Sequence, residues 1–305
     1  MTKIGTSDLD VYGLNLGCNV FNTTADEAAS HTVLDAYTAA GGNFLDTADM
    51  YGDNGGSERF IGTWLAKRGR RDELVIATKV AKSAHRPGLS AKNIAAAAED
   101  SLRRLQTDHI DLYYAHEDDR SVPLEETLGA FDTLIHDGKV RYVAASNYEP
   151  DRLAEALSTS DREGLARYVA LQPHYNLVER DYEKELAPLV QREGLSTLPY
   201  FGLAVGFLTG KYRSKDEPGD SPRAPRALKY LDERGERVLA VLDEVAAAHR
   251  ASVASVSLAW LGAQPTVAAP IASARNPDQL EDLIASVSLE LSAEELAALS
   301  AASAS

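Results

Sequence analysis

Four titratable side chains of different kinds follow short apolar runs with the composition of buried β-strands. They are Asp46, Tyr51, Lys79 and His116. The aspartate, the lysine and the histidine each end such a run, and the tyrosine follows the aspartate by a few residues. In a barrel of alternating strands and helices, active-site groups stand at the carboxyl ends of the strands. We therefore expect a carboxylate, a phenol, an ammonium and an imidazole to meet at one rim.

Together these groups suit the delivery of a proton to a carbonyl oxygen. A free tyrosine has a pKa of about 10, and a neighbouring Lys⁺ favours the phenolate and lowers that pKa. A buried aspartate paired with the lysine keeps it charged and oriented, and a histidine can donate a hydrogen bond to the carbonyl. Because no side chain supplies a hydride, reduction of the carbonyl would require a cofactor.

Simpler interpretations of single residues stay open beside this one. Asp46 and Lys79 could form an ion pair that serves the structure alone. Ser146 and Asn147 follow a predicted strand and could cap the next helix, a common role for both types. His174 also follows a strand end, where we interpret it as a wall residue rather than a catalyst.

The elements that must position these residues alternate along the chain. Short apolar runs rich in β-branched or aromatic residues predict strands covered on both faces. The predicted strands are Leu14–Gly17, Asn43–Asp46, Leu74–Lys79, Asp111–His116, Val140–Ala145, Tyr168–Gln172, Ser196–Tyr200 and Val267–Ile271. Between them, apolar residues recur at the spacing of amphipathic helices. The predicted helices are Ala25–Ala40 (after a Thr24 cap), Ser57–Arg68, Ala91–Leu105, Glu125–Asp137, Pro150–Leu157, Tyr182–Arg192, Glu233–His249, Ser255–Gly262 and Pro277–Ala285.

This alternation predicts an α/β fold, a (β/α)8 TIM barrel with residues 1–305 as one domain. A doubly wound sheet would carry a G-x-G-x-x-G turn after an early strand, and the sequence has none. An N-terminal β-hairpin is expected to turn at Thr6-Ser7-Asp8 and to cap the barrel bottom. Leu289–Ser305 predicts an extra C-terminal helix with a capping box. Residues 211–235 predict a long loop, which in a compact domain is usually functional or disordered.

Three segments that hold the four candidate residues resemble one known family. They are Asp46-Thr47-Ala48-Asp49-Met50-Tyr51-Gly52, Ile76-Ala77-Thr78-Lys79 and Tyr113-Tyr114-Ala115-His116. These segments are similar to parts of the aldo-keto reductase superfamily, whose tetrad is Asp, Tyr, Lys and His. The resemblance implies that Tyr51 is the general acid, that Asp46 and Lys79 tune it, and that His116 orients the substrate carbonyl.

The resemblance continues along nearly the whole chain and implies an NADPH site. At the nicotinamide end, Ser146, Asn147 and Gln172 would hold the carboxamide, and Tyr200 would stack on the ring. Towards the other end, Leu203 and Gly206 would line the pyrophosphate path and Lys211 would reach a phosphate. The segment implied for the adenosine end contains Ser273, Arg275, Gln279 and Asp282.

Physical reasoning agrees with the phosphate assignment. A phosphate site in this fold commonly lies after the last two strands, where backbone N–H groups at a helix start bind anions. Arg275 could fork onto a 2′-phosphate, which favours NADPH over NADH. As alternatives, Arg275 and Lys211 could be ordinary surface cations, and Arg223 and Arg226 either clamp the pyrophosphate or are only solvated.

Two segments depart from the family pattern. Many relatives carry an aromatic residue, often Trp, where this chain has Asn19-Val20-Phe21-Asn22-Thr23. The common Tyr-Ser-Pro-Leu is Tyr200-Phe201-Gly202-Leu203 here, so a serine contact to pyrophosphate is missing. The departures concern substrate range and cofactor affinity rather than the tetrad.

Composition excludes several other classes of function. A net charge of −15 argues against nucleic acid or an anionic membrane as a partner. Cys18 is the only cysteine, so no intrachain disulfide forms and a reducing cytosol is expected. The chain has no apolar run of signal-peptide or membrane-span length. It has no His/Cys cluster with metal-ligand spacing and no G-x-S-x-G motif. We expect a cytoplasmic enzyme that uses no metal.

The sequence therefore predicts reversible, NADPH-dependent reduction of an aldehyde or ketone to an alcohol. One alternative is a cofactor-binding regulatory subunit, as in channel-associated relatives, some of which lack the histidine that His116 supplies here. A second is a non-redox lyase or isomerase acting on a sugar. The sequence leaves open the identity of the carbonyl substrate, the physiological direction, the oligomeric state and the strictness of NADPH over NADH.

Overall fold

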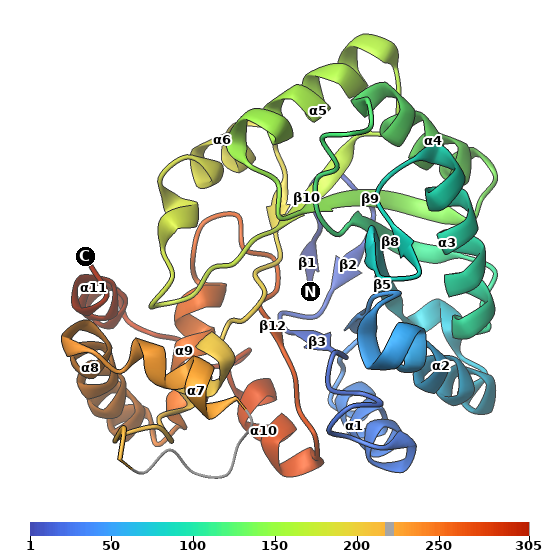
Figure 1. Ribbon diagram of the computed structural model, residues 1–305. Helices are drawn as coiled ribbons and strands as arrows, with labels where there is room; N and C mark the ends of the chain where they lie inside the picture. The colour runs from blue at the N-terminus through green and yellow to red at the C-terminus, as the bar shows by residue number, and fades with distance from the viewer. Residues whose placement is uncertain (217–222, 305) are drawn as a thin grey trace.

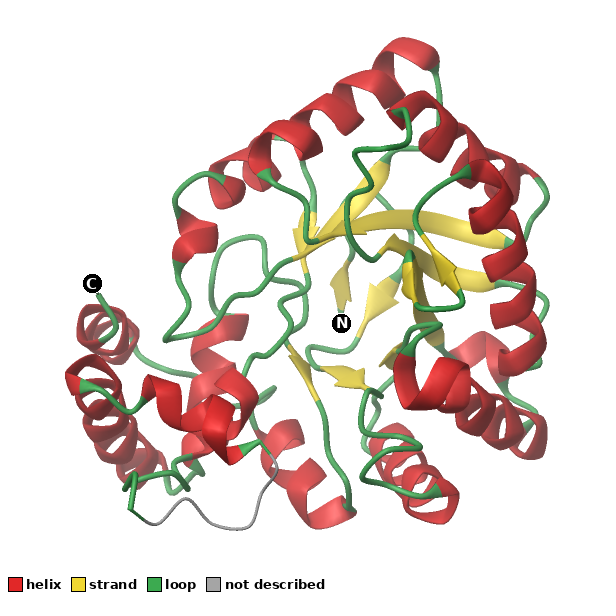
Figure 2. Cartoon of the chain, viewed as in Figure 1, coloured by secondary structure: helices red, strands yellow, loops and turns green. Residues whose placement is uncertain are grey.

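Within residues 1–216 and 223–304, which the computed structural model describes, eight parallel strands form a ring. Their order is β11-β10-β9-β8-β5-β4-β3-β12. The strands are β3 Asn15–Gly17, β4 Phe44–Asp46, β5 Val75–Val80, β8 Ile110–Ala115, β9 Val140–Ser146, β10 Tyr168–Gln172, β11 Ser196–Thr197 and β12 Ile271–Ala272. Helices surround the ring on its outer side (Figures 1 and 2). The predicted (β/α)8 barrel is confirmed.

Backbone hydrogen bonds close the ring between β11 and the segment that leads into β12. Thr197 forms a parallel bridge with Val267, and the N–H of Ala268 donates to the Thr197 carbonyl at 3.0 Å. Both β11 and β12 are shorter than the strands predicted from the sequence, because Pro199 and Pro270 have no N–H to donate to a ladder of hydrogen bonds. β12 pairs with β3, so the sheet has no free edge there.

Helices follow most strands, as predicted, and lie in the outer layer (Figure 1). They are α1 Glu27–Ala39, α2 Tyr51–Arg68, α3 Ala91–Leu105, α4 Leu124–His136, α5 Pro150–Glu163, α6 Leu186–Arg192, α7 Ala224–Ala227, α8 Glu233–His249, α9 Val253–Gly262, α10 Pro277–Ala285 and α11 Ala293–Ala302. α11 begins with the predicted capping box and packs beside α8. No helix among the described residues combines the length and the apolar character that a membrane span needs.

Two local predictions are corrected. Asp26 caps α1 in place of Thr24, because its side chain accepts a hydrogen bond from the N–H of Ala29 at 2.9 Å. The backbone N–H of Thr24 is engaged in a turn with Val20 instead. The stretch predicted as a long loop contains α7 and a 3-10 turn at Leu228–Tyr230. Residues 217–222 of that stretch, and Ser305 of the predicted last helix, lie outside the described residues.

A second hairpin was not predicted from the sequence. β6 Lys82–Ser83 pairs in antiparallel fashion with β7 Arg86–Pro87 directly after β5. Its strands are too short to show the alternation by which a strand is recognised. The hairpin follows the carboxyl end of a barrel strand, the end at which active-site groups stand in this fold.

The predicted N-terminal hairpin caps the amino end of the barrel. β1 Thr2–Lys3 and β2 Asp10–Val11 pair in antiparallel fashion, and in Figure 1 they lie inside the ring of strands. Ile4 and Leu9 are buried among the apolar side chains that fill the barrel interior. The hairpin therefore covers side chains that would otherwise face water, and burial of such apolar surface stabilises the barrel.

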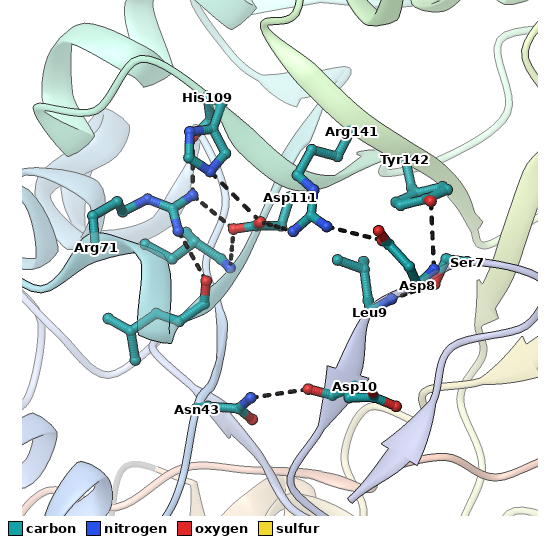
Figure 3. Close-up of polar contacts among 12 residues, drawn as sticks. Ser7, Asp8, Leu9, Asp10, Asn43, Arg71, His109, Asp111, Arg141 and Tyr142 are labelled. Carbon is teal, nitrogen blue, oxygen red and sulfur yellow. Dashed lines mark hydrogen bonds and ion pairs between the residues drawn. The ribbon is translucent and has the colours of Figure 1, made fainter.

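Ion pairs centred on Asp111 support this closed end (Figure 3). The Asp111 carboxylate is almost fully buried and pairs with Arg71 at 2.6 Å and with Arg141 at 2.8 Å. It also accepts a hydrogen bond from the N–H of Ile76 at 2.9 Å. Arg141 in turn pairs with Asp8 in the turn of the N-terminal hairpin at 2.8 Å. One carboxylate thus joins neighbouring strands to the cap.

Replacing Asp111 with Ala is expected to lower the free energy of unfolding by about 3 kcal/mol, because removal of one partner leaves buried groups uncompensated. Asp8→Ala is the matched control, since it removes an exposed partner of the same Arg141 and should cost less than about 1 kcal/mol. Chemical denaturation of both variants measures the difference. Equal losses would mean that burial of the Asp111 carboxylate is unimportant.

Candidate active site

The two-residue alternation of a strand decides which side chains enter the barrel. Val75 and Ala77 of β5, and Leu112 and Tyr114 of β8, belong to the interior cluster. Continuing the same alternation turns Lys79 and the residue after β8, His116, to the interior. Asp46, Ser146 and Gln172 are the last residues of β4, β9 and β10. The carboxyl ends of neighbouring strands thereby present polar groups above an apolar interior.

Lys79 and Asp46 form a buried ion pair at the centre of this rim. The Lys79 Nζ donates to Asp46 Oδ1 at 2.6 Å and to the carbonyl of Thr47 at 2.7 Å. The other carboxylate oxygen of Asp46 accepts a hydrogen bond from Gln172 Nε2 at 2.9 Å. Both charged side chains are almost entirely shielded from solvent. Burial lowers the pKa of Lys79, but Asp46 and Tyr51 outweigh it, so the pKa lies above 10.5 and the lysine stays charged.

Tyr51 is held over this pair by an unusual backbone at the start of α2. Residues 52–55 have positive φ angles, which glycine adopts readily. A Cβ on Gly52 would lie 2.6 Å from the carbonyl oxygen of Phe21, so no larger residue fits there. Asn22 donates to the Gly52 carbonyl at 2.7 Å and ties the turn to the loop after β3. Lys79 Nζ lies 4.9 Å from the centre of the Tyr51 ring.

The pKa of Tyr51 is raised above 10.0, which corrects the direction expected from the sequence. Burial of the phenol is the largest cause. The charge of Lys79 and a hydrogen bond with it act in the opposite direction without overcoming burial. Tyr51 is therefore a phenol at neutral pH, the form that can donate a proton.

His116 is neutral at the same rim. Its pKa lies well below 6.5 because of burial first and then the positive charges of Lys79 and Lys82. Its ring meets that of Tyr51 edge to face, with centroids 5.9 Å apart. A neutral imidazole keeps one N–H donor. The side chain can thus donate a hydrogen bond without competing for the proton of Tyr51.

A cavity of about 570 Å³ opens beside these residues. Asp46, Tyr51 and His116 line it, whereas Lys79 lies beneath the surface and is not exposed to the cavity. The eleven residues that the family resemblance implied for cofactor binding also line this cavity. They are Ser146, Asn147, Gln172, Tyr200, Leu203, Gly206, Lys211, Ser273, Arg275, Gln279 and Asp282.

Polar side chains are already fixed at the end of the cavity near Tyr51. Ser146 Oγ donates to the Gln172 carbonyl at 3.0 Å, and Asn147 donates to the His116 carbonyl at 2.8 Å. The Tyr200 hydroxyl donates to Asn147 Oδ1 at 2.9 Å. His174 stacks on Tyr200 with centroids 5.2 Å apart and does not line the cavity, which supports its interpretation as a support for the wall.

The opposite end of the cavity gathers positive charge. Arg275 lies just before α10, where the N–H of Arg275 donates to Gln279 Oε1 at 3.1 Å. The pKa of Arg223 is lowered by burial and by the nearby charges of Arg275 and Arg226. Lys211 Nζ lies beside Gly206, 3.6 Å from where a Cβ on that glycine would stand. Cations brought so close together repel one another, and a bound anion would relieve the repulsion.

Several further lining residues were not proposed as site residues from the sequence. They include Asn19, which accepts a hydrogen bond from Ser273 Oγ at 2.8 Å. Lys82, Met50 and Phe201 also line the cavity. None of them stands at the end of a regular strand, so strand-end reasoning could not find them. Arg223, for which the sequence left a pyrophosphate clamp and a solvated cation both open, also lines the cavity, whereas Arg226 does not.

The cavity fits a dinucleotide with a nicotinamide at one end and phosphates at the other. Its end near Tyr51 offers amide and hydroxyl groups for a carboxamide, and its cationic end suits phosphate. Among the described residues, no group of three or more His, Cys, Asp or Glu side chains could hold a metal ion.

Comparison with known proteins agrees with this arrangement. The model of the aldo/keto reductase family matches residues 12–304. Protein tas of Escherichia coli is 35% identical over 98% of this chain and 96% of its own length. Norsolorinic acid reductase stcV of Emericella nidulans is 34% identical over 87% of this chain and 69% of its own length. A probable voltage-gated potassium channel subunit beta of Oryza sativa is 33% identical over 91% of this chain and 88% of its own length.

Proposed function

This chain is a member of the aldo/keto reductase family, and we propose that it catalyses the reversible reduction of a small aldehyde or ketone to an alcohol, with NADPH as the reductant. The observation that carries the proposal is the buried Lys79, which holds Asp46 at 2.6 Å and lies against Tyr51 beside a neutral His116. A structural ion pair alone would not need a phenol and an imidazole at the mouth of a cavity.

The roles of the residues follow from their protonation states. When bound, NADPH supplies the hydride that reduces the carbonyl carbon. His116 donates a hydrogen bond to the carbonyl oxygen and orients it. Tyr51 gives its proton to the developing alkoxide, and Lys79 stabilises the phenolate that remains. Asp46 keeps Lys79 charged and in place. In the reverse direction the Tyr51 phenolate takes the proton from the alcohol.

The cofactor would lie along the cavity from Tyr200 to Arg275. Ser146, Asn147 and Gln172 would hold the carboxamide, and Tyr200 would cover the nicotinamide ring. Leu203, Gly206 and Lys211 would line the pyrophosphate path. The residues proposed for the adenosine 2′-phosphate end are Ser273, Arg275, Gln279 and Asp282. The gathering of Arg275, Arg223 and Arg226 supports an anionic ligand at this end.

NADPH consumption across a panel of aldehydes and ketones tests the proposal. Turnover of at least one carbonyl compound is the expected result. The relative described as a channel subunit beta gives one alternative a specific basis, namely a cofactor-binding regulatory subunit. Purified protein that binds NADPH but does not oxidise it in the presence of any carbonyl compound of the panel would favour that alternative. Protein that neither binds nor needs NADPH would instead favour a lyase or isomerase.

Arg275→Ala is expected to weaken NADPH binding by about tenfold or more while changing NADH binding little. The physical reason is that a hydrogen bond to a charged group is worth roughly 1.5–3 kcal/mol, and NADH lacks the 2′-phosphate that would accept it. Fluorescence titration with each cofactor measures the two dissociation constants. Equal losses for both cofactors would mean that Arg275 does not recognise the 2′-phosphate.

A further inference from the structure

The cations that line the cavity divide into two groups by position. Within the described residues they are Lys82, Lys211, Arg223 and Arg275. Arg223 lies close enough to both Arg275 and Tyr212 for their charges to affect its pKa, and Lys211 Nζ lies 5.0 Å from the Tyr212 ring centre. These contacts join three of the cations at the phosphate end. Lys82 is instead near His116, whose pKa its charge helps to lower.

Lys82 therefore places a positive charge beside the reacting groups. The phosphates of a dinucleotide, bound at the other end of the cavity, would not neutralise this charge. It belongs to β6, in the hairpin that leaves the same strand as Lys79. The carboxylates that line the cavity, within the described part of the chain, are Asp46 and Asp282. Asp46 is engaged by Lys79 and Gln172. Asp282 belongs to α10, which lies at the phosphate end of the cavity. The wall near Lys82 thus offers no acidic neighbour that is fixed in the cavity.

The partner of Lys82 lies outside the cavity and is easily exchanged. Lys82 Nζ pairs with Glu117 at 3.2 Å, and the two side chains are 34% and 45% exposed. Exposed ion pairs of this kind contribute only about 0–1 kcal/mol. A carboxylate on a bound molecule could replace Glu117 at little cost, and it would meet Lys82 in a more enclosed setting where the attraction is stronger.

We propose that Lys82 recognises an anionic group on the substrate, so that the favoured substrates are aldehydes or ketones that also carry a carboxylate. This inference rests on the proposed function, since it names the substrate class for the same site. Lys82 acts here as a specificity residue, which holds the charged end of the substrate while His116 and Tyr51 engage the carbonyl.

Two aldehydes that differ in charge but little in size provide the test. The wild-type protein, with NADPH, is expected to show a KM for 4-carboxybenzaldehyde at least ~5-fold below that for 4-methylbenzaldehyde. Lys82→Met should raise the first KM about 5-fold relative to the second. Lys92→Met, which removes an exposed lysine of α3 outside the cavity, is the matched control and should change neither.

Glu117→Gln gives a result of opposite sign. Freed from its partner, Lys82 should bind the carboxylate more tightly, so the KM for 4-carboxybenzaldehyde should fall while that for 4-methylbenzaldehyde stays the same. Added salt should weaken the carboxylate preference of the wild type. If Lys82 and Glu117 served only to hold the loop, both substitutions would instead affect the two aldehydes in parallel, and the inference would be overturned.

A binding measurement separates failure of this inference from failure of the proposed function. Calorimetry in the presence of NADPH compares 4-carboxybenzyl alcohol with 4-methylbenzyl alcohol on the same variants. Absence of a Lys82-dependent preference for the carboxylate would overturn the inference whether or not aldehydes are reduced. Such a preference without turnover of either aldehyde would support the anion site and contradict the reductase proposal.

Discussion

Tyr51→Phe is expected to reduce the rate of carbonyl reduction by about two to four orders of magnitude, the contribution typical of a general acid. The substitution removes only the hydroxyl that would protonate the alkoxide. Affinity for NADPH should change little, because the phenyl ring keeps the shape of the cavity wall. Single-turnover kinetics and a cofactor titration measure the two quantities separately.

Tyr142→Phe is the matched control for this substitution. It removes the same atom at the closed end of the barrel, where the Tyr142 hydroxyl accepts a hydrogen bond from the Asp8 N–H at 3.4 Å. Its turnover should equal that of the wild type. A Tyr51→Phe protein with near-normal turnover would show that another group delivers the proton.

Lys79→Met should impair both stability and activity. Removing one partner of a buried ion pair typically costs about 3–5 kcal/mol, because the other charge remains buried without compensation. Here Asp46 would lose the ammonium at 2.6 Å and the Thr47 carbonyl would lose its donor at 2.7 Å. Activity should fall at least about a hundredfold, since nothing would remain to stabilise the Tyr51 phenolate.

The double variant Lys79→Met/Asp46→Asn distinguishes the two effects. It contains no uncompensated charge, and its amide can still accept from Gln172, so it should recover much of the free energy of unfolding lost by the single variant. Its activity should stay low. Denaturation curves and kcat of the three proteins provide the comparison. Recovery of activity together with stability would mean that the pair serves the fold alone.

The sequence predicted the barrel and the location of its polar rim because both depend on local signals. Strands covered on both faces are apolar throughout, so a single polar residue at the end of such a run stands out, as Asp46 and Lys79 do. The same alternation that buries Val75 and Ala77 turns Lys79 inward. Strand ends in a barrel converge, and residues far apart in sequence therefore line one cavity.

Features that depend on tertiary environment could not be predicted in the same way. The direction of the Tyr51 pKa depends on how far burial outweighs the charge of Lys79, and burial of a single phenol is not visible in the sequence. The choice of Asp26 over Thr24 as a helix cap depends on a neighbouring turn. Lys82 lies in a hairpin whose strands are too short to have a recognisable pattern, so its place on the cavity wall was missed.

The ion pairs around Asp111 and the cavity occupy opposite ends of the same set of strands. Cap attachment and substrate recognition consequently draw on different side chains. Directed evolution of the wall around Met50, Lys82 and Phe201 could therefore explore new carbonyl compounds while the Asp111 network continues to stabilise the fold. The chain is thus suited to engineering as a biocatalyst, since substitutions in the cavity wall leave the ion pairs at the opposite end of the strands intact.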